Sequence, residues 1–495
     1  MQHNIRSGLS CLHEQDISYI VLYGGYAAPN RLEETVRWHG SVVLHIMKRG
    51  YIMLEQNNKK KPKKYAGILA HPTSFPSPYG IGDLGPGAYQ FIDFLAASGL
   101  NLWQVLPLGH TGFGDSPYQP FSAFAGQPLI IDIDYLKKKK LLIDEDFSAM
   151  PDWDPEKIDY GTLIEFKTGL LKKAYERFID ADYTDDMSRD EELMAKFDAF
   201  VKNTTWLADY SLFMAGKDAH EGMPWYMWDD SLKKPTARQK TTWKKKLANG
   251  IGYYNFLQFL FAEQWQALKT YANDLGISIV GDTPIFLAWD SADVWSNQEL
   301  FLLDSKGYPI EVAGVPPDYF SATGQLWGNP LYNWKKHTET GYAWWIERIK
   351  YQLTVTDFLR IDHFRGFDRY WAVPYGEETA INGEWKPAPG LNFFTQLEAN
   401  LGYHLPIIAE DLGEIEELIY GDDDDDDDCD CDDDCCCDDE YDDDEDAMYE
   451  CVCPNCGDTI MLGENIIADG SIDCPNCGES LEFDFSEIED EDNED

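Results

Sequence analysis

Five short apolar runs between residues 65 and 420 restrict the fold of this chain more than any other feature. Each run ends in polar, glycine or proline residues, and stretches with helical periodicity separate the runs. Nearly continuous hydrophobicity indicates strands that are covered on both faces, which favours parallel pairing with helices outside the sheet. The sequence therefore predicts an α/β fold whose strands lie in AGILAHPTSF, LNLWQVLPLG, ISIVGDTPIF, DFLRIDHFRG and LPIIAEDLG.

A long insertion separates the second predicted strand from the third, at about residues 136–275. Apolar residues recur there every three or four positions, as they do on one face of an amphipathic helix. They are Leu163, Phe166, Leu170, Ala174 and Phe178 and, nearer the end of the insertion, Phe256, Leu260 and Leu268. We expect these residues to form a helical core and not a binding site.

Polar residues cluster just past the carboxyl end of all five predicted strands. The clusters are His71 to Ser74, Gly109 to Gln119, Asp282, Asp362 to Arg365, and Glu410 to Asp411. In a (β/α)-barrel the loops at that rim meet over the barrel mouth, where the chemistry takes place. Turn formation alone explains the glycines and prolines but not carboxylates on three successive strands. The pattern therefore favours an active site at the rim.

Asp362 and Glu410 are the candidate catalytic pair. Arg360 and Asp362 lie two residues apart on one strand, so their side chains point to the same face. A guanidinium beside Asp362 predicts a low pKa, as a nucleophile needs. Glu410 has a negative neighbour and aromatic surroundings, which predict a raised pKa and a proton donor. On adjacent strands the carboxyl groups could lie about 5–5.5 Å apart, the separation of a retaining glycosidic displacement. The alternative is a purely structural ion pair between Arg360 and Asp362.

Aromatic residues are frequent between the third and fourth predicted strands. Flat rings pack against the C–H faces of sugars, although each tryptophan taken alone is more typical of a core. These tryptophans are Trp289, Trp295, Trp327 and Trp334. The stretch from Gly314 to Tyr332 is rich in glycine and proline and carries Tyr319 and Phe320. A loop of that length in a compact domain predicts a lid.

Several motifs together resemble the 4-α-glucanotransferases called amylomaltases or disproportionating enzymes. The resemblance covers about residues 65 to 418, with all motifs in order. The motifs are HPTSFPSPYGIGDLGPGAY, GDSPYQPFSAFAGQPLIID, GDTPIFLAWDSADVW, GVPPDYFSATGQLWGNPLY, RIDHFRGF and IIAEDLG. The resemblance implies a (β/α)8-type TIM barrel that moves α-1,4-glucan segments between maltooligosaccharides, or to glucose, without a metal or organic cofactor for catalysis. An α-glucan hydrolase is disfavoured, because the lid and sugar-site motifs match the transferases.

The resemblance also implies roles for single residues. Asp362 matches the nucleophile and Glu410 the acid/base. Arg360 and His363 match residues that hold the donor sugar at the cleavage point. The remaining matches are the sugar-site contacts Ser116, Tyr118, Asp282 and Trp327, and the acceptor-side lid residues Tyr319 and Phe320.

The family pattern continues past IIAEDLG with about three more strands and a His-Asp motif that supplies a third essential carboxylate. No histidine follows His404 in this chain. Asp411 is a poor substitute, because side chains alternate along a strand and Asp411 would point away from the face that Glu410 uses. We therefore expect residues 53–420 to form an incomplete barrel, with about five of eight strands and low or no activity. The alternative function is an inactive interaction protein whose intact module is a zinc ribbon.

The last 75 residues differ from the rest in charge and cysteine content. Residues 421–495 contain 34 acidic residues, no Lys or Arg, and ten of the eleven cysteines. CPNCG occurs twice, which gives the spacing Cys453-x2-Cys456-x17-Cys474-x2-Cys477. That spacing predicts a zinc ribbon at 449–485 with a structural Zn²⁺. The run at 421–448 is expected to be a disordered linker, and 486–495 an acidic tail.

Charge and targeting signals limit the partners and the location. Phosphate contacts need cations, so the acidic tail argues against nucleic acid and leaves a basic protein, or no partner, as the expectation. The chain shows no signal peptide and no long apolar span, which predicts no membrane association and a cytoplasmic location. Residues 1–52 are interpreted as a leader of uncertain structure.

Overall fold

The computed structural model describes residues 65–154, 156–180, 191–403 and 405–410 of the main part of the chain. Nearer the C-terminus it describes 448–452, 459–463, 471–473, 477 and 480–482. Internal contacts divide the chain into two compact units, Met1–Asp423 and Asp424–Asp495. The interpretations of the leader, of Asp411 and of the acidic run concern residues outside these ranges.

The first unit is built on a parallel sheet of five strands in the order β1-β2-β3-β6-β9. The strands are β1 (Gly67–Leu69), β2 (Leu102–Gln104), β3 (Ser278–Pro284), β6 (Phe358–Asp362) and β9 (Ile407–Ala409). All four pairings are parallel, which confirms the five predicted strands and their direction. Neighbouring residues such as Leu102 and Trp103 are both buried, as in a sheet that is covered on both faces. Within the described residues β1 and β9 are the edge strands; closure into a barrel stays a prediction.

Helices cover this sheet. They include α2 (Pro86–Ala97), α9 (Ala248–Asp274), α12 (Ala343–Val355) and α13 (Leu391–Leu401). Helix α2 starts with Pro86 in its first turn, where a missing backbone N–H does no harm. Helix α9 packs on β3 and α12 packs on β6, and the Trp265 indole donates to the Val355 carbonyl over 2.9 Å. No helix in the described part of the chain is both long and apolar enough to cross a membrane.

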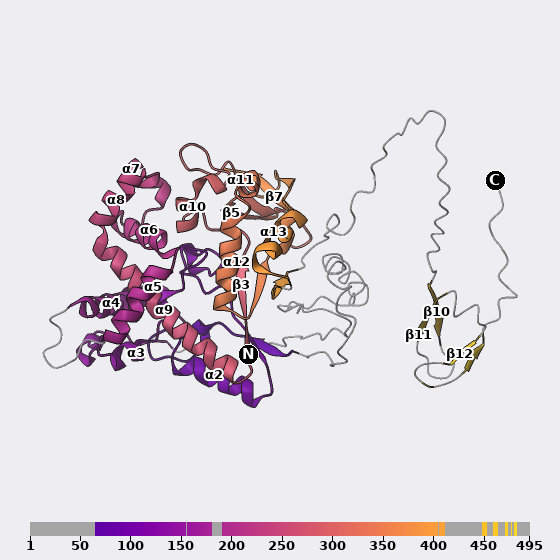
Figure 1. Ribbon diagram of the computed structural model, residues 1–495, viewed down its shortest axis with the longest axis horizontal. Helices are drawn as coiled ribbons and strands as arrows, with labels where there is room; N and C mark the ends of the chain where they lie inside the picture. The colour runs from indigo at the N-terminus through magenta and orange to yellow at the C-terminus, as the bar shows by residue number, and fades with distance from the viewer. Residues whose placement is uncertain are drawn as a thin grey trace. The chain divides into compact units, whose positions relative to one another are not determined.

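The insertion between β2 and β3 is helical, as predicted. It contains α3 (Ile133–Lys138), α4 (Tyr160–Ile179), α5 (Glu191–Asn203), α6 (Leu207–Ala219), α7 (Asp230–Lys233) and α8 (Ala237–Lys246), and α9 completes it. The predicted stripe on α4 is buried except for the half-buried Phe166, and Phe256, Leu260 and Leu268 on α9 are buried. Figure 1 shows these helices gathered on one side of the first unit.

A second sheet was not expected from the sequence. It is antiparallel, in the order β5-β4-β7-β8, with β4 (Glu311–Val315), β5 (Gln325–Pro330), β7 (Arg369–Pro374) and β8 (Glu384–Pro387). The short helices α10 (Ala292–Ser296) and α11 (Trp334–Glu339) complete this part of the unit. The interpretation of Gly314 to Tyr332 as one long loop is therefore wrong at both ends, because β4 and β5 pair as a hairpin. Only residues 316–324 connect the two strands.

The second unit contains two antiparallel strand pairs. Strand β10 (Met448–Val452) pairs with β11 (Thr459–Gly463), and β12 (Ser471–Asp473) pairs with β13 (Ser480–Glu482). In chain order, each CPNCG motif falls between the two strands of one pair. Of the four predicted zinc ligands, Cys477 alone lies within the described residues, where it is exposed; Cys453, Cys456 and Cys474 lie outside them.

Candidate active site

Three carboxylates meet one arginine at the carboxyl ends of β3, β6 and β9. Arg360 lies opposite Asp282 in the β3–β6 pairing, and its Nη1 donates to Asp282 Oδ1 over 2.6 Å. Its Nη2 lies 3.0 Å from Asp362 Oδ1 and donates to Glu410 Oε1 over 2.5 Å. The parallel register of three strands thus places one guanidinium at the centre of three acids.

The two candidate catalytic carboxylates are close together. Because Asp362 Oδ1 and Glu410 Oε1 contact the same nitrogen of Arg360, they can be separated by no more than the sum of those two distances. These two oxygens are therefore at most about 5.5 Å apart, which suits the close carboxyl pair of a retaining glycosidic displacement. An inverting site needs about 6.5–9.5 Å to hold a water between its carboxyl groups.

His363 helps to fix Glu410. Its backbone N–H donates to Glu410 Oε2 over 2.6 Å, and its φ of 55° lies in the left-handed region. A residue other than glycine rarely adopts that conformation, and such residues cluster at functional sites. Both carboxylate oxygens of Glu410 are thus held, one by Arg360 and one by a strained turn.

The pKa of Asp362 is raised, whereas the sequence predicted a lowered pKa. The sequence suggested that Arg360 would keep it low, but burial and the negative Glu410 raise it to about 7. Arg360 still lowers it, yet that effect is divided among three acids and is outweighed. Near neutral pH we therefore expect Asp362 to be only partly ionised.

Tyr118 and Ser116 approach the cluster from the loop after β2. The Tyr118 hydroxyl donates to Asp282 Oδ2 over 2.8 Å, and burial raises the pKa of both groups. The backbone N–H of Tyr118 donates to Ser116 Oγ over 3.3 Å, so Ser116 shapes the loop that delivers the tyrosine. Asp282 is thereby held between Tyr118 on one side and Arg360 on the other.

Aromatic rings line one side of the cluster. Trp327, on β5, meets the His363 ring edge to face with centroids 4.9 Å apart, and Phe286 lies 6.4 Å from the same ring. Burial lowers the pKa of His363 to about 4, so its imidazole is neutral at neutral pH. The second sheet thus contributes Trp327 to a site that is otherwise built on the first.

The candidate site residues do not all meet. Seven converge at the rim: Tyr118, Asp282, Trp327, Arg360, Asp362, His363 and Glu410. Ser116 joins them through Tyr118. Tyr319 and Phe320 stand apart at the tip of the β4–β5 hairpin, where both side chains are fully exposed. Their position is open to solvent, as a lid needs.

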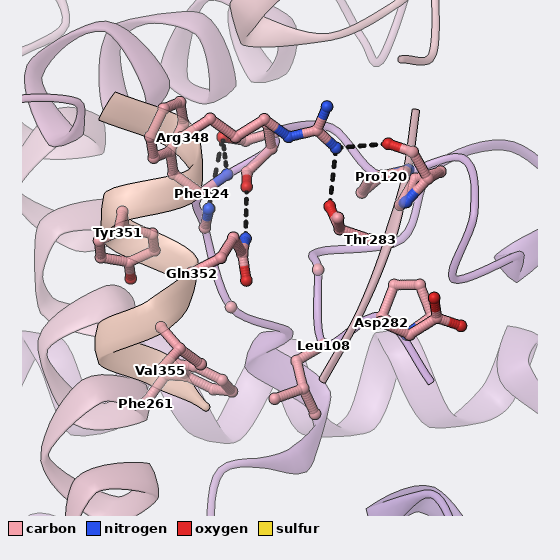
Figure 2. A pocket seen from close by; sticks show the side chains of 17 residues that line it. Leu108, Pro120, Phe124, Phe261, Asp282, Thr283, Arg348, Tyr351, Gln352 and Val355 are labelled. Carbon is pink, nitrogen blue, oxygen red and sulfur yellow. Dashed lines mark hydrogen bonds between the residues drawn. The ribbon is translucent and has the colours of Figure 1, made fainter. Parts of the chain in front are cut away.

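Arg348 is a supporting residue that the sequence did not reveal. Its Nη2 donates to Thr283 Oγ1 over 2.8 Å and to the Pro284 carbonyl over 2.6 Å, and its Nη1 donates to the Ile285 carbonyl over 3.2 Å. Figure 2 shows the guanidinium facing Thr283, while the Asp282 carboxylate points away from it. Arg348 thus fixes the strand end that carries Asp282. Arg348 lies near Glu347 and Lys350 in a helix of mixed polarity, so its sequence context gives no signal of that role.

Within the residues that the structure covers, no group of three or more His, Cys, Asp or Glu side chains is arranged to hold an ion. The three rim carboxylates point at Arg360, whose guanidinium supplies the positive charge at their centre.

Comparisons with known proteins identify the family of this chain. The family model described as 4-alpha-glucanotransferase matches residues 70–421. A 4-alpha-glucanotransferase of Synechocystis is 50% identical over 354 residues, which are 71% of this chain and 69% of the relative. One of Aquifex aeolicus is 48% identical over 359 residues, 72% of this chain and 70% of the relative.

Solved structures give the same result. The amylomaltase of Streptococcus agalactiae, solved in complex with acarbose, matches with a TM-score of 0.67 and 41% identity. That match covers 72% of this chain and 70% of the other. The amylomaltase of Corynebacterium glutamicum, at 22% identity, shares the fold with a TM-score of 0.57 over 71% of this chain and 48% of the other.

Proposed function

This chain belongs to the 4-alpha-glucanotransferase family, and we propose that it transfers α-1,4-glucan segments by double displacement at the rim of β3, β6 and β9. The observation that carries the proposal is the contact of Asp362 and Glu410 with one nitrogen of Arg360. That contact supports the proposal, because two carboxylates held so close together suit the nucleophile and the proton donor of a retaining mechanism. Asp282, Tyr118 and His363 surround the same point and would hold the sugar.

In the first step Asp362 attacks the anomeric carbon of the donor glucan. The bond from that carbon to the glycosidic oxygen breaks, and Glu410 gives its proton to the departing 4-oxygen. The product is an ester between Asp362 and the sugar. Arg360 contacts both acids, so its positive charge stabilises the ionised form of Asp362 that attacks.

In the second step the charge pattern reverses. Asp362 is neutral in the ester, so Glu410 no longer faces a negative neighbour and becomes a proton acceptor. The 4-hydroxyl of an acceptor glucan loses its proton to Glu410 and attacks the anomeric carbon, which releases Asp362. Transfer exceeds hydrolysis when a sugar held by Trp327, Tyr319 and Phe320 keeps water away from the ester.

Incubation with maltotriose tests this function directly. We expect glucose together with maltodextrins longer than maltotriose, resolved by chromatography, because each transfer shortens one molecule and lengthens another. Glucose and maltose without longer products would instead indicate the hydrolase. Absence of any product would favour the inactive interaction protein.

The rate of glucan transfer by this chain is expected to be low. The family match ends at residue 421, and the His-Asp motif that the resemblance implies has no counterpart after His404. We therefore expect slower turnover than that of the Synechocystis relative measured side by side. Equal rates would show that the third carboxylate is replaced or not needed.

For the second unit we propose a structural zinc ribbon. Two Cys-x2-Cys pairs, each between two antiparallel strands in chain order, have the spacing of a four-cysteine site. Four protein ligands would complete a tetrahedron, so the ion would support folding and leave no position for substrate.

Metal analysis of the full chain checks the ribbon. We expect about one zinc per chain, and a loss of bound zinc when Cys453 and Cys474 are both changed to serine. Cys429→Ser is the matched control, because it removes a thiol from the acidic run outside both pairs. Zinc content far below one per chain, or equal content in both variants, would reject the site.

A further inference from the structure

Four aromatic side chains from separate segments meet away from the carboxylates. Tyr226 and Trp289 stack with centroids 3.7 Å apart and an interplanar angle of 11°. Tyr308 and Tyr375 lie edge to face against Trp289, at 5.3 and 5.7 Å. Tyr226, Trp289, Tyr308 and Tyr375 are called the aromatic patch below.

The aromatic patch is accessible and amphipathic. Tyr375 is 47% exposed, and the other three rings are half-buried. The hydroxyls of Tyr308 and Tyr375 and the Asp290 carboxylate interact electrostatically with the Tyr226 hydroxyl, so polar groups gather at the ring edges. Lys217 pairs with Asp290, which compensates its charge. Flat rings with neutral polar edges suit a sugar better than a charged ligand.

The rings are held in place by backbone contacts. The Trp289 indole donates to the Gly307 carbonyl over 3.0 Å, and the Trp225 indole donates to the Trp289 carbonyl over 2.7 Å. The backbone N–H of Tyr375 donates to the Ile310 carbonyl over 3.1 Å. A ligand would therefore meet a preformed surface and would not have to order it.

The patch and the catalytic rim share two chain segments. Phe286 lies 6.4 Å from the His363 ring and 6.3 Å from Tyr370 on β7. Three residues after Phe286 the chain reaches Trp289, and five residues after Tyr370 it reaches Tyr375. An extended strand rises about 3.3 Å per residue, so Tyr375 lies roughly 16 Å along the chain from Tyr370.

We propose that the aromatic patch is a second binding surface for an α-1,4-glucan, which holds a part of a long chain remote from the cleaved bond. The inference rests on the proposed function for its choice of ligand. Stacking of sugar faces on Tyr375 and its neighbours would add affinity for long glucans. Maltotriose would gain less affinity, because it is too short to occupy the cleavage site and the aromatic patch together.

The test compares Tyr375→Ala with Tyr403→Ala, a matched change of another exposed tyrosine, 78% exposed. Affinity for glycogen is measured by retardation in native gels that contain it. We expect Tyr375→Ala to weaken glycogen binding about five- to tenfold, as loss of one aromatic contact does. Tyr375→Phe keeps the ring and should bind nearly as the parent chain does. With amylose as donor, KM should rise in Tyr375→Ala while kcat changes little.

The outcomes separate this inference from the proposed function. A parent chain that binds glycogen through Tyr375 but leaves maltotriose unconverted would support the patch and reject the transferase activity. Equal glycogen affinity in Tyr375→Ala and Tyr403→Ala would overturn the patch. A changed oligomeric state of Tyr375→Ala by size-exclusion chromatography, with glycogen affinity unaltered, would also overturn it and identify a contact between copies of the chain.

Discussion

Asp362→Asn is expected to abolish glucan transfer, with kcat lowered about 10³-fold or more relative to the parent chain. Asparagine has nearly the shape of aspartate but cannot form the ester with the anomeric carbon. The contact with Arg360 Nη2 shows that this side chain points into the cluster, where a donor sugar would meet it. The measurement is the initial rate of glucose release from maltotriose.

A comparison with Glu410→Gln separates the two roles. An activated donor such as α-maltosyl fluoride releases fluoride, which needs no proton, so the first step bypasses the acid. Glu410→Gln should therefore still release fluoride and still form the ester, detectable as a mass increase of the intact chain. Asp362→Asn should do neither.

Asp209→Asn on α6 is the control, because it makes the same chemical change in a surface ion pair with Lys240. Its rates should equal those of the parent. Rapid maltotriose conversion by Asp362→Asn would show that another group is the nucleophile, and a failure of Glu410→Gln with both donors would remove its assignment as the acid.

The parallel sheet was predictable, whereas the antiparallel sheet was not. Continuous apolar runs mark strands such as β3 and β6 because both of their faces are covered. Strand β8 reads EWKP, and most of its residues are exposed, so it carries neither an apolar run nor an alternating pattern. Its pairing with β7 depends on a partner more than ten residues away, which local periodicity does not report.

The site was predictable in its members but not in its electrostatics. Acids at strand ends identified Asp282, Asp362 and Glu410, since parallel strands bring their carboxyl ends to one edge. The two-residue spacing on β6 placed Arg360 beside Asp362 but did not predict its other partners. The structure shows three acids around that guanidinium, and this number follows from the register of three strands. The sequence of one strand alone does not show how many acids its arginine will contact.

Arg360→Met should inactivate the chain and lower its stability most at alkaline pH. The change leaves Asp282, Asp362 and Glu410 together without their counter-charge, and loss of one partner from a buried ionic cluster costs about 3–5 kcal/mol in free energy of unfolding. Arg360→Lys keeps the charge but loses the forked guanidinium that contacts three acids. We therefore expect Arg360→Lys to lose less stability than Arg360→Met. Arg238→Met on α8 is the control, because that side chain is exposed.

The pH dependence identifies the cause of this loss. Asp362 has a raised pKa, about 7, even with Arg360 present, and removal of the guanidinium would raise it further. A carboxyl group whose pKa is higher in the folded than in the unfolded state destabilises the fold above its folded pKa. That effect disappears as pH falls toward the unfolded value, about 3.9, because the group is then protonated in both states. Urea midpoints of Arg360→Met and the parent chain should therefore differ widely at pH 8 and converge toward pH 5. If the urea midpoints differ by the same amount at both pH values, the lost stability comes from packing of the arginine side chain and not from its charge.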